Sequence, residues 1–186
     1  MSGNEHILAQ VRDFADRAHG EQLHKYTPER YIVHPLRVMR HCQQVTSDIA
    51  ILCAALLHDV LEDTATAEAE VLGFLVPLLG APQAERTLKL AIELTDVYVW
   101  SAYPRMRRRE RKEKEARRMA QVSAEGQTIK YADILDNSGE IVTQDPEFAP
   151  VYLKECRALL KAMTRGNAGL REQALDLVDT GLKILG

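Results

Sequence analysis

Residues 48–64 place a run of apolar side chains directly before a group of titratable ones. Residues 51–57 are all apolar, and His58 and Asp59 follow them without a break. Glu62 and Asp63 come one helical turn later. On a single helix, residues four apart share a face, so we expect His58 to lie over Glu62 and Asp59 over Asp63. The rest of the chain must therefore bury the apolar part of this helix and accommodate its charged end.

Apolar residues elsewhere recur mainly with helical spacing, and no segment alternates with period two for long enough to predict a strand. Asn4, Asp48, Thr66 and Asn167 are the expected helix caps. Pro77, Gly80 and Gly126 are expected to end helices. We predict an all-α fold, a single helical bundle of about eight to ten helices with residues 1–186 as one domain. The further expected helices cover residues 4–18, 34–44, 67–76, 82–94, 105–124, 128–137, 149–163 and 167–182.

Composition narrows the class of protein. The chain has 186 residues, of which 46% are hydrophobic and 27% charged, as in ordinary globular proteins. Its net charge of -3 gives a phosphate backbone no overall attraction, so we expect no nucleic-acid partner. Three cysteines without metal-ligand spacing suit a reducing compartment. The first six residues show no signal pattern and no apolar run approaches about 18 residues, so we expect a cytoplasmic protein without a membrane partner.

Four residues stand out as a candidate metal site: His34, His58, Asp59 and Asp133. Two imidazoles and two carboxylates suit a divalent ion such as Mn²⁺, Fe²⁺, Co²⁺ or Zn²⁺. Such an ion lowers the pKa of its water toward neutrality and polarises a phosphoryl oxygen. Glu62 and Asp63 are placed to orient that water or to accept its proton. Taken singly, the His-Asp pair is more typical of a solvated helix cap, Asp133 of a carboxylate on a helix face, and His34 of a turn residue before proline.

Three sequence blocks carry a resemblance to a known family. They are Tyr-Ile-Val-His-Pro at residues 31–35, Ala-Ala-Leu-Leu-His-Asp-Val-Leu-Glu-Asp-Thr at 54–64, and Ile-Lys-Tyr-Ala-Asp-Ile-Leu-Asp-Asn at 129–137. In this order they resemble the HD superfamily of metal-dependent phosphohydrolases. Within it, the chain is similar to the hydrolase domain of RelA/SpoT-type enzymes and to the stand-alone small alarmone hydrolases. The block His-Asp-x-x-Glu-Asp-Thr is the specific part of this resemblance.

The resemblance implies a function and assigns roles to residues. It implies hydrolysis of the 3′-pyrophosphate of (p)ppGpp, a small nucleotide substrate, with one Mn²⁺ held by the four candidate ligands. It implies that Glu62 and Asp63 are the catalytic acidic pair. It also implies substrate contacts by Lys25, Asn137, Arg111 and Lys112. Asn137 lies four residues after Asp133, which places both on one helix face. No room for a synthetase or regulatory domain is expected in 186 residues.

Several departures from the family pattern keep other interpretations open. His24 stands where the family commonly has arginine, Asp136 where it has an aromatic residue or histidine, and Ser138 follows Asn137. The substrate could therefore be another phosphorylated nucleotide, such as a nucleoside monophosphate or the 2′-phosphate of NADPH. A nucleotide-binding module that does not hydrolyse its ligand is a second alternative, and an RNA-binding role for the basic segment 105–118 is a third. The sequence also leaves open whether the chain forms a homo-oligomer.

The basic segment has a simpler interpretation as well. Glu110, Glu113 and Glu115 are interleaved with its arginines and lysines at ion-pair spacings. We therefore expect most of the segment to be a solvated helix face held by ion pairs, with Arg111 and Lys112 as the exceptions that reach a substrate.

Overall fold

A computed structural model describes residues 3–186. Met1 and Ser2 lie outside the described residues, and with them the first part of the N-terminal segment in which the sequence shows no signal pattern. The described chain forms ten helices and no strand. The predicted all-α class and helix count are thereby confirmed. Two compact units follow one another, the first ending at Thr95 and the second running from Asp96 to Gly186. The prediction of one domain over residues 1–186 stays a prediction.

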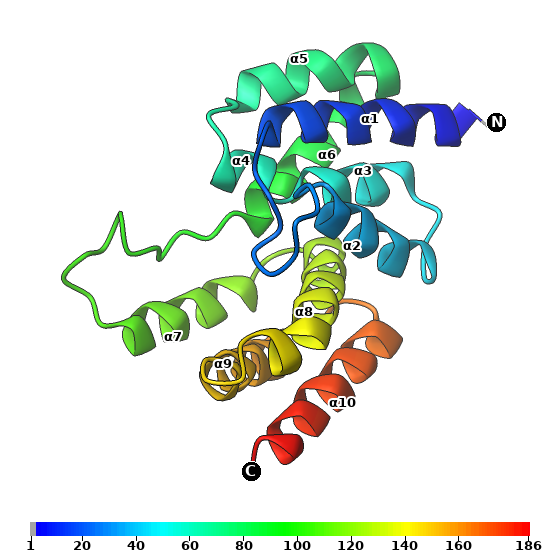
Figure 1. Cartoon of the computed structure of the whole chain (residues 1–186). Coiled ribbons are helices and arrows are strands. Elements are labelled where there is room, and N and C mark those ends of the chain that lie inside the picture. The colour runs from blue at the N-terminus through cyan, green and yellow to red at the C-terminus, as the bar shows by residue number, and fades with distance from the viewer. Residues whose placement is uncertain (1–2) are drawn as a thin grey trace. The chain divides into compact units, whose positions relative to one another are not determined.

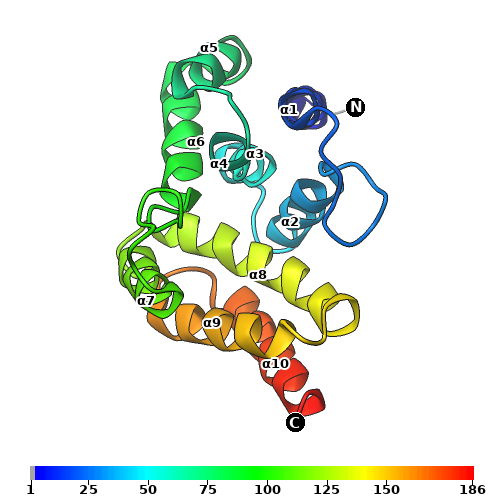
Figure 2. The ribbon, with the colours of Figure 1, turned by 60° about the vertical axis from the view of Figure 1, so that its left-hand side comes forward.

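The first unit is built around a buried apolar helix. Its helices are α1 (Gly3–His19), α2 (Val33–Gln43), α3 (Ile49–Leu57), α4 (Val60–Asp63), α5 (Glu68–Leu79) and α6 (Ala81–Leu94). Residues 50–57 of α3 are all buried. A helix that is apolar all round must be covered on every side, and α1, α2 and α6 all pack against α3 (Figure 2).

Asp48 fixes the start of α3, as predicted. Its carboxylate accepts hydrogen bonds from the backbone N–H groups of Ala50 and Ile51. The same carboxylate forms a two-pronged ion pair with Arg86 of α6, with N–O distances of 3.0 and 2.8 Å. One side chain therefore caps α3 and ties it to α6.

The prediction of a single helix over residues 48–64 is wrong. Helix α3 ends at Leu57, His58 and Asp59 form a turn, and the short helix α4 begins at Val60. Asp59 has φ −98° and ψ −7°, away from ideal helical values, so the helical register restarts after it. His58 and Asp59 therefore do not share a helix with Glu62 and Asp63, and the expected face-to-face pairs do not follow from helical spacing.

Three breaker and cap predictions also differ from the structure. Pro77 lies inside the last turn of α5, where it removes one backbone N–H donor without ending the helix, and Gly80 with φ 76° ends it. The cap position of α5 is Ala67 and not Thr66. Gly126 lies in the first turn of a helix instead of ending one.

The second unit contains α7 (Arg108–Met119), α8 (Ala124–Gln144), α9 (Ala149–Ala162) and α10 (Ala168–Ile184). Helices α8, α9 and α10 pack against one another, and α7 packs against α9 (Figure 1). The predicted basic helix is shorter than expected, because Ser123 caps α8 by accepting a hydrogen bond from the Gly126 N–H. Asn167 caps α10, as predicted, by accepting from the Leu170 N–H.

The turn between α9 and α10 is fastened to α8. The Arg165 N–H donates to Gln127 Oε1 at 2.8 Å, and the Asn167 N–H donates to Thr128 Oγ1 at 2.9 Å. Gln127 is fully buried and also donates to the Met119 carbonyl. Between these two attachments, Gly166 lies so close to α8 that a Cβ atom there would be 2.5 Å from the Tyr131 ring.

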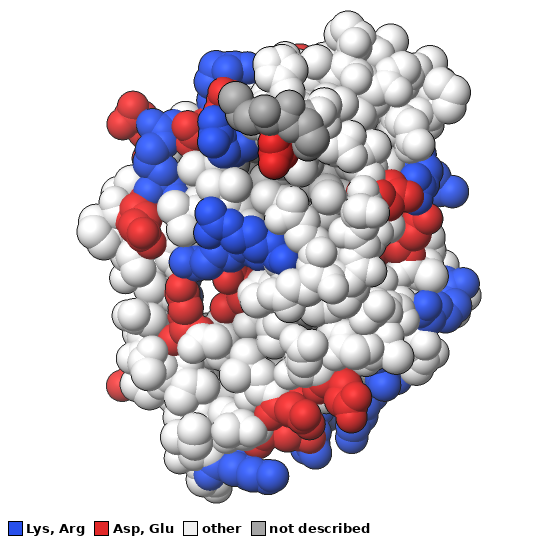
Figure 3. Space-filling view, turned by 90° about the vertical axis from the view of Figure 1, so that its right-hand side faces the viewer, with Lys and Arg blue, Asp and Glu red and all other residues white. Residues whose placement is uncertain are grey.

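Surface charge is mixed. On the face shown in Figure 3, small groups of basic and acidic side chains lie beside one another, with broad uncharged areas between them. None of the helices within residues 3–186 combines the length and apolar character needed to cross a membrane.

Candidate metal centre

Three of the four predicted ligands come together in the first unit. His34, His58 and Asp59 each offer one ligand atom, and these atoms all lie within 4.8 Å of one another. The Asp59 Oδ2 atom is 3.0 Å from His58 Nε2 and 3.6 Å from His34 Nε2. Both histidines are almost completely buried, at 3% and 2% exposure, so the cluster is fixed by packing.

Two local features of the backbone create this convergence. His34 and Pro35 lie in the first turn of α2, which holds the His34 ring against that of His58 with 5.2 Å between centroids. His58 and Asp59 occupy the turn between α3 and α4. On a continuous helix, adjacent side chains diverge by about 100°. The turn lets these two neighbours point to one place.

The hydrogen bonding of His58 fits a cation at this place. Its Nδ1 lies 2.8 Å from the Ala55 carbonyl oxygen, which can only accept, so Nδ1 carries a proton. In the neutral ring, Nε2 then presents a lone pair toward the Asp59 carboxylate oxygen 3.0 Å away. Two electron-rich atoms that face each other in a buried place require a positive charge between them, either a proton or a metal ion. A backbone carbonyl behind a ligating imidazole is also the usual arrangement in metal sites.

The cluster extends to Tyr31 and Asp63. The Tyr31 hydroxyl donates to Asp59 Oδ2 at 2.6 Å. Desolvation, and next the charge of Asp59, raise the pKa of Asp63, while hydrogen bonds from Tyr31 and Gln22 act in the opposite direction. Asp63 is therefore a better proton acceptor than an ordinary aspartate, which suits the predicted general base. Glu62 lies beside it on α4 with its side chain exposed.

Lys25, the predicted substrate contact of the first unit, lies in the exposed loop between α1 and α2. Its amino group donates to the Tyr26 hydroxyl at 2.7 Å and lies 4.6 Å from the centre of the Tyr26 ring. The neighbouring His24 is buried, whereas Lys25 is exposed.

Asp133, the fourth predicted ligand, belongs to the second unit and is buried on α8. It accepts a hydrogen bond from the Asn137 amide at 2.7 Å, so the two residues share a helix face as predicted. It also forms an ion pair with Lys130 at 2.8 Å. The assignment of all four residues to one metal site stays a prediction.

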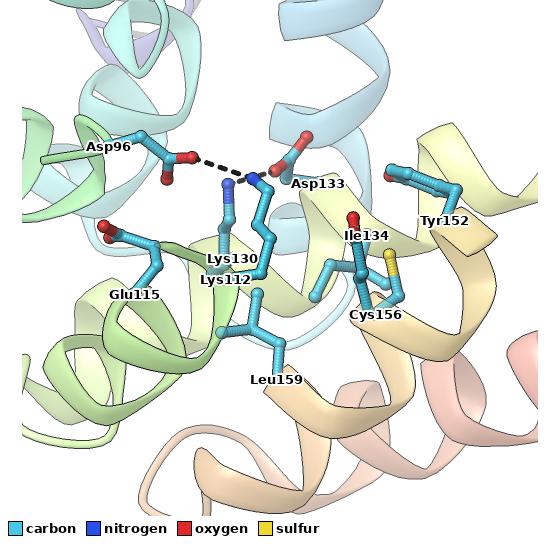
Figure 4. Close-up of a pocket in the computed structure, with 10 residues that line it drawn as sticks. Asp96, Lys112, Glu115, Lys130, Asp133, Ile134, Tyr152, Cys156 and Leu159 are labelled. Atoms are coloured by element: carbon cyan, nitrogen blue, oxygen red, sulfur yellow. Dashed lines mark hydrogen bonds and ion pairs between the residues drawn. The ribbon is translucent and has the colours of Figure 1, made fainter. Parts of the chain in front are cut away.

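Asp133 lines a small cavity of about 90 Å³ in the second unit, together with charged and apolar side chains. The amino groups of Lys112 and Lys130 point toward the carboxylates of Asp96 and Asp133, and Tyr152 and Cys156 form another wall (Figure 4). Lys112 is 3.3 Å from Asp96. The cavity therefore holds two lysine–aspartate pairs, an arrangement that can exchange its carboxylates for phosphate oxygens.

Arg111 plays a different part from Lys112. Its guanidinium hydrogen-bonds the Met106 carbonyl, which fastens the loop before α7. Other basic residues of α7 form ion pairs: Arg109 with Glu113, Lys114 with Glu110, and Arg118 with Glu115. Glu115 is buried and accepts from the N–H groups of residues 97 and 98. The expectation of a helix face held by ion pairs agrees with these contacts.

Several polar residues of the two sites were not singled out from the sequence. Tyr31 and Gln22 contact Asp63, and Lys130 pairs with Asp133. A helical spacing of three residues between Lys130 and Asp133 could have revealed that pair. Tyr31 and Gln22 belong to a loop, where spacing carries no such information.

Comparison with known proteins gives a family match and similar proteins of named activity. The family model described as HD domain matches residues 31–138. The chain is 26% identical over 185 residues to a probable guanosine-3′,5′-bis(diphosphate) 3′-pyrophosphohydrolase of Mycoplasma pneumoniae, covering 96% of this chain. It spans only 24% of that protein's length. It is 34% identical over 145 residues to the human guanosine-3′,5′-bis(diphosphate) 3′-pyrophosphohydrolase, covering 75% of this chain and 72% of the human one.

A solved structure shares the fold over almost the whole chain. It is described as a metazoan ortholog of SpoT that hydrolyzes ppGpp, and it superposes with a TM-score of 0.75 at 25% sequence identity. The match covers 95% of this chain and 96% of the other. The order of helices that carries His34, His58 and Asp59 is therefore found in a protein of similar length.

Proposed function

The chain belongs to the HD-domain family, and on that premise we propose that it is a metal-dependent pyrophosphohydrolase acting on (p)ppGpp. The observation that carries this proposal is the convergence of His34, His58 and Asp59 within 4.8 Å. The curated relatives that cover most of the chain are named for hydrolysis of the 3′-pyrophosphate of ppGpp, which supports this substrate. The residues 1–186 act as one HD domain in this proposal.

His34, His58 and Asp59 would hold the metal ion, with Asp133 as the fourth ligand. Two imidazoles with carboxylates suit Mn²⁺, the metal we assign, and also Fe²⁺, Co²⁺ and Zn²⁺. When bound, such an ion supplies Lewis-acid polarisation of a phosphoryl oxygen and a lower pKa for a water molecule. The chain's own contribution is to hold the imidazole nitrogens and the Asp59 oxygen at one place before the ion arrives.

Asp63 and Glu62 orient the attacking water and take its proton. The water oxygen forms a bond to the phosphorus attached to the 3′ oxygen, and the bond from that phosphorus to the 3′ oxygen breaks. Pyrophosphate leaves, the 3′ oxygen becomes a hydroxyl, and GDP or GTP remains. The raised pKa of Asp63 favours acceptance of the proton.

Basic and amide groups bind the nucleotide. Lys25 is exposed on its loop and binds as a point charge. Lys112, which pairs with Asp96 at 3.3 Å in the cavity that Asp133 lines, binds a phosphate oxygen in place of that carboxylate. Asn137 binds the nucleotide beside Asp133, and Arg111 contributes positive charge from α7. The cytoplasm is the proposed location, since Cys42, Cys53 and Cys156 are all free.

Product analysis tests the proposal. The purified protein is incubated with ppGpp and Mn²⁺, and the products are separated by anion-exchange chromatography with ³¹P NMR to identify pyrophosphate. We expect GDP and pyrophosphate in equal amounts. His58→Ala and Asp59→Ala should abolish both Mn²⁺ binding and hydrolysis.

Matched controls are available on α1. His6→Ala and Asp13→Ala remove the same side-chain types from exposed positions and should retain full activity. A folded Asp59→Ala protein with full activity would refute the metal assignment. A parallel panel of GMP, NADPH and ppGpp separates the substrates, and turnover of GMP or NADPH alone would refute (p)ppGpp as the substrate.

A further inference from the structure

One tyrosine hydroxyl contacts both halves of the proposed catalytic machinery. Tyr31 Oη donates to Asp59 Oδ2 at 2.6 Å, closer than either His58 or His34 approaches the same oxygen. The same hydroxyl hydrogen-bonds Asp63, which partly offsets the rise in the pKa of that carboxyl caused by desolvation. A phenol has a single O–H proton, so it cannot donate to two ionised carboxylates at once.

The position of the Tyr31 ring is fixed independently of these carboxylates. The ring packs against His19 of α1 with 4.5 Å between centroids and lies edge-on to His34 at 5.9 Å. His19 is buried and its Nδ1 is 3.0 Å from Gln22 Oε1. Gln22 in turn hydrogen-bonds Asp63. The hydroxyl can therefore change its hydrogen-bond acceptor by rotating about its C–O bond, while the ring stays in place.

We propose that Tyr31 is a positioning residue that links the cation-binding carboxylate Asp59 to the water-orienting carboxylate Asp63 through its single hydroxyl proton. In the structure the hydroxyl donates to Asp59 at 2.6 Å. A cation on Asp59 reduces the negative charge at its oxygens, and Asp63 becomes the better acceptor. With a cation held by Asp59, the Tyr31 hydroxyl would donate to Asp63 and orient that carboxylate. No covalent bond changes in this step.

The inference rests on the proposed metal site, and its kinetic readout rests also on the proposed reaction. The test compares the wild type with Tyr31→Phe, which removes the hydroxyl and keeps the ring against His19. Tyr103→Phe is the matched control, because Tyr103 is 36% exposed and belongs to the other unit. Each protein is checked for folding by circular dichroism and thermal melting before binding is measured.

The first readout is Mn²⁺ affinity, measured by titration with electron paramagnetic resonance of free Mn²⁺. Hydrogen-bond partners of metal ligands typically affect affinity or activity about 10- to 100-fold. We expect Tyr31→Phe to weaken Mn²⁺ binding about tenfold and to lower kcat by a similar factor at saturating Mn²⁺, with KM changed less than about twofold. Tyr103→Phe should match the wild type in all three quantities.

A double-mutant cycle with Asp63→Asn tests the link itself. If one hydroxyl serves both carboxylates, the effect of Tyr31→Phe on Mn²⁺ affinity differs between the wild-type protein and the Asp63→Asn variant, and the losses in kcat are not additive. Equal effects of Tyr31→Phe in both backgrounds overturn the proposal, as does Mn²⁺ affinity within about twofold of the wild type. A wild type that releases no pyrophosphate refutes the proposed function, while the Mn²⁺ cycle still decides the role of Tyr31.

Discussion

Replacement of Gly166 by alanine is expected to destabilise the protein strongly. A Cβ atom at residue 166 would meet Tyr131 Cε2 at 2.5 Å, the Thr128 backbone nitrogen at 2.8 Å and Thr128 Oγ1 at 3.0 Å. Tyr131 is fully buried, so its ring has little room to move. The Thr128 nitrogen belongs to the backbone of α8 and can move only with the helix. The turn after α9 must therefore separate from α8.

The size of the effect follows from these contacts. Overpacking by one methyl group typically costs about 1–3 kcal/mol, and contact with backbone favours the upper part of this range. Separation would also weaken the hydrogen bonds of Arg165 and Asn167 to α8. For a chain of this size, about 1 kcal/mol corresponds to roughly 2–4 °C in Tm. We expect Gly166→Ala to lose about 2–3 kcal/mol and roughly 4–12 °C.

Gly139→Ala is the matched control within the same unit. Gly139 lies inside α8, is exposed, and has nothing within 4 Å of a Cβ atom. Alanine in an exposed helix interior is about 0.5–1 kcal/mol more favourable than glycine. The free energies of unfolding of both variants are measured by urea titration, with the slope m compared to exclude a change in the unfolded state. The reasoning is refuted if Gly166→Ala is as stable as the wild type.

Three further results are expected. The pKa of Asp48 is lowered from 3.8, chiefly by Arg86, so its contribution to stability is present above pH 3.8 and is lost as the pH falls through the lower folded value. Arg86→Ala should lose stability at pH 7 and show a smaller loss on acidification in urea titrations. The raised pKa of Asp63 should place the acidic limb of the kcat/KM profile above pH 3.8, and Asp63→Asn should remove that limb. Burial raises the pKa of Cys42, Cys53 and Cys156 to about 12. At pH 8 the thiolate fraction is therefore about 10⁻⁴, and a thiol reagent should label these cysteines rapidly only in denaturant. Mass spectrometry of the labelled protein measures this.

Much of the fold could be predicted because the signals are local. Apolar spacing and the caps Asp48 and Asn167 are properties of neighbouring residues, and they located α3 and α10. Pro77 and Gly126 gave wrong breaks: Gly126 lies in the first turn of α8 and Pro77 in the last turn of α5, and the ends of both helices depend on tertiary packing. The predicted length of the basic helix failed for the same reason, since Ser123 competes as a cap for the following helix.

The site illustrates a second limit. Residue chemistry and family resemblance identified His34, His58 and Asp59 correctly as neighbours, although they come from two segments. The reasoning that placed His58 over Glu62 was wrong, because it assumed a continuous helix where the chain turns. Tyr31 was not identified, since its contact with Asp59 spans 28 positions in sequence and no periodicity encodes it.

The position of the proposed metal ligands His58 and Asp59 at the end of α3 has a consequence for local motion. Amide hydrogens exchange slowest where opening requires unfolding of the core, and α3 is buried along residues 50–57. His58 and Asp59 follow directly on this segment, whereas Glu62 and Asp63 lie on the short, more exposed α4. Native-state hydrogen exchange should therefore fall into two regimes within six residues. The groups that hold the ion would share the slow opening of the core, and the groups that handle the proton would move on a faster timescale.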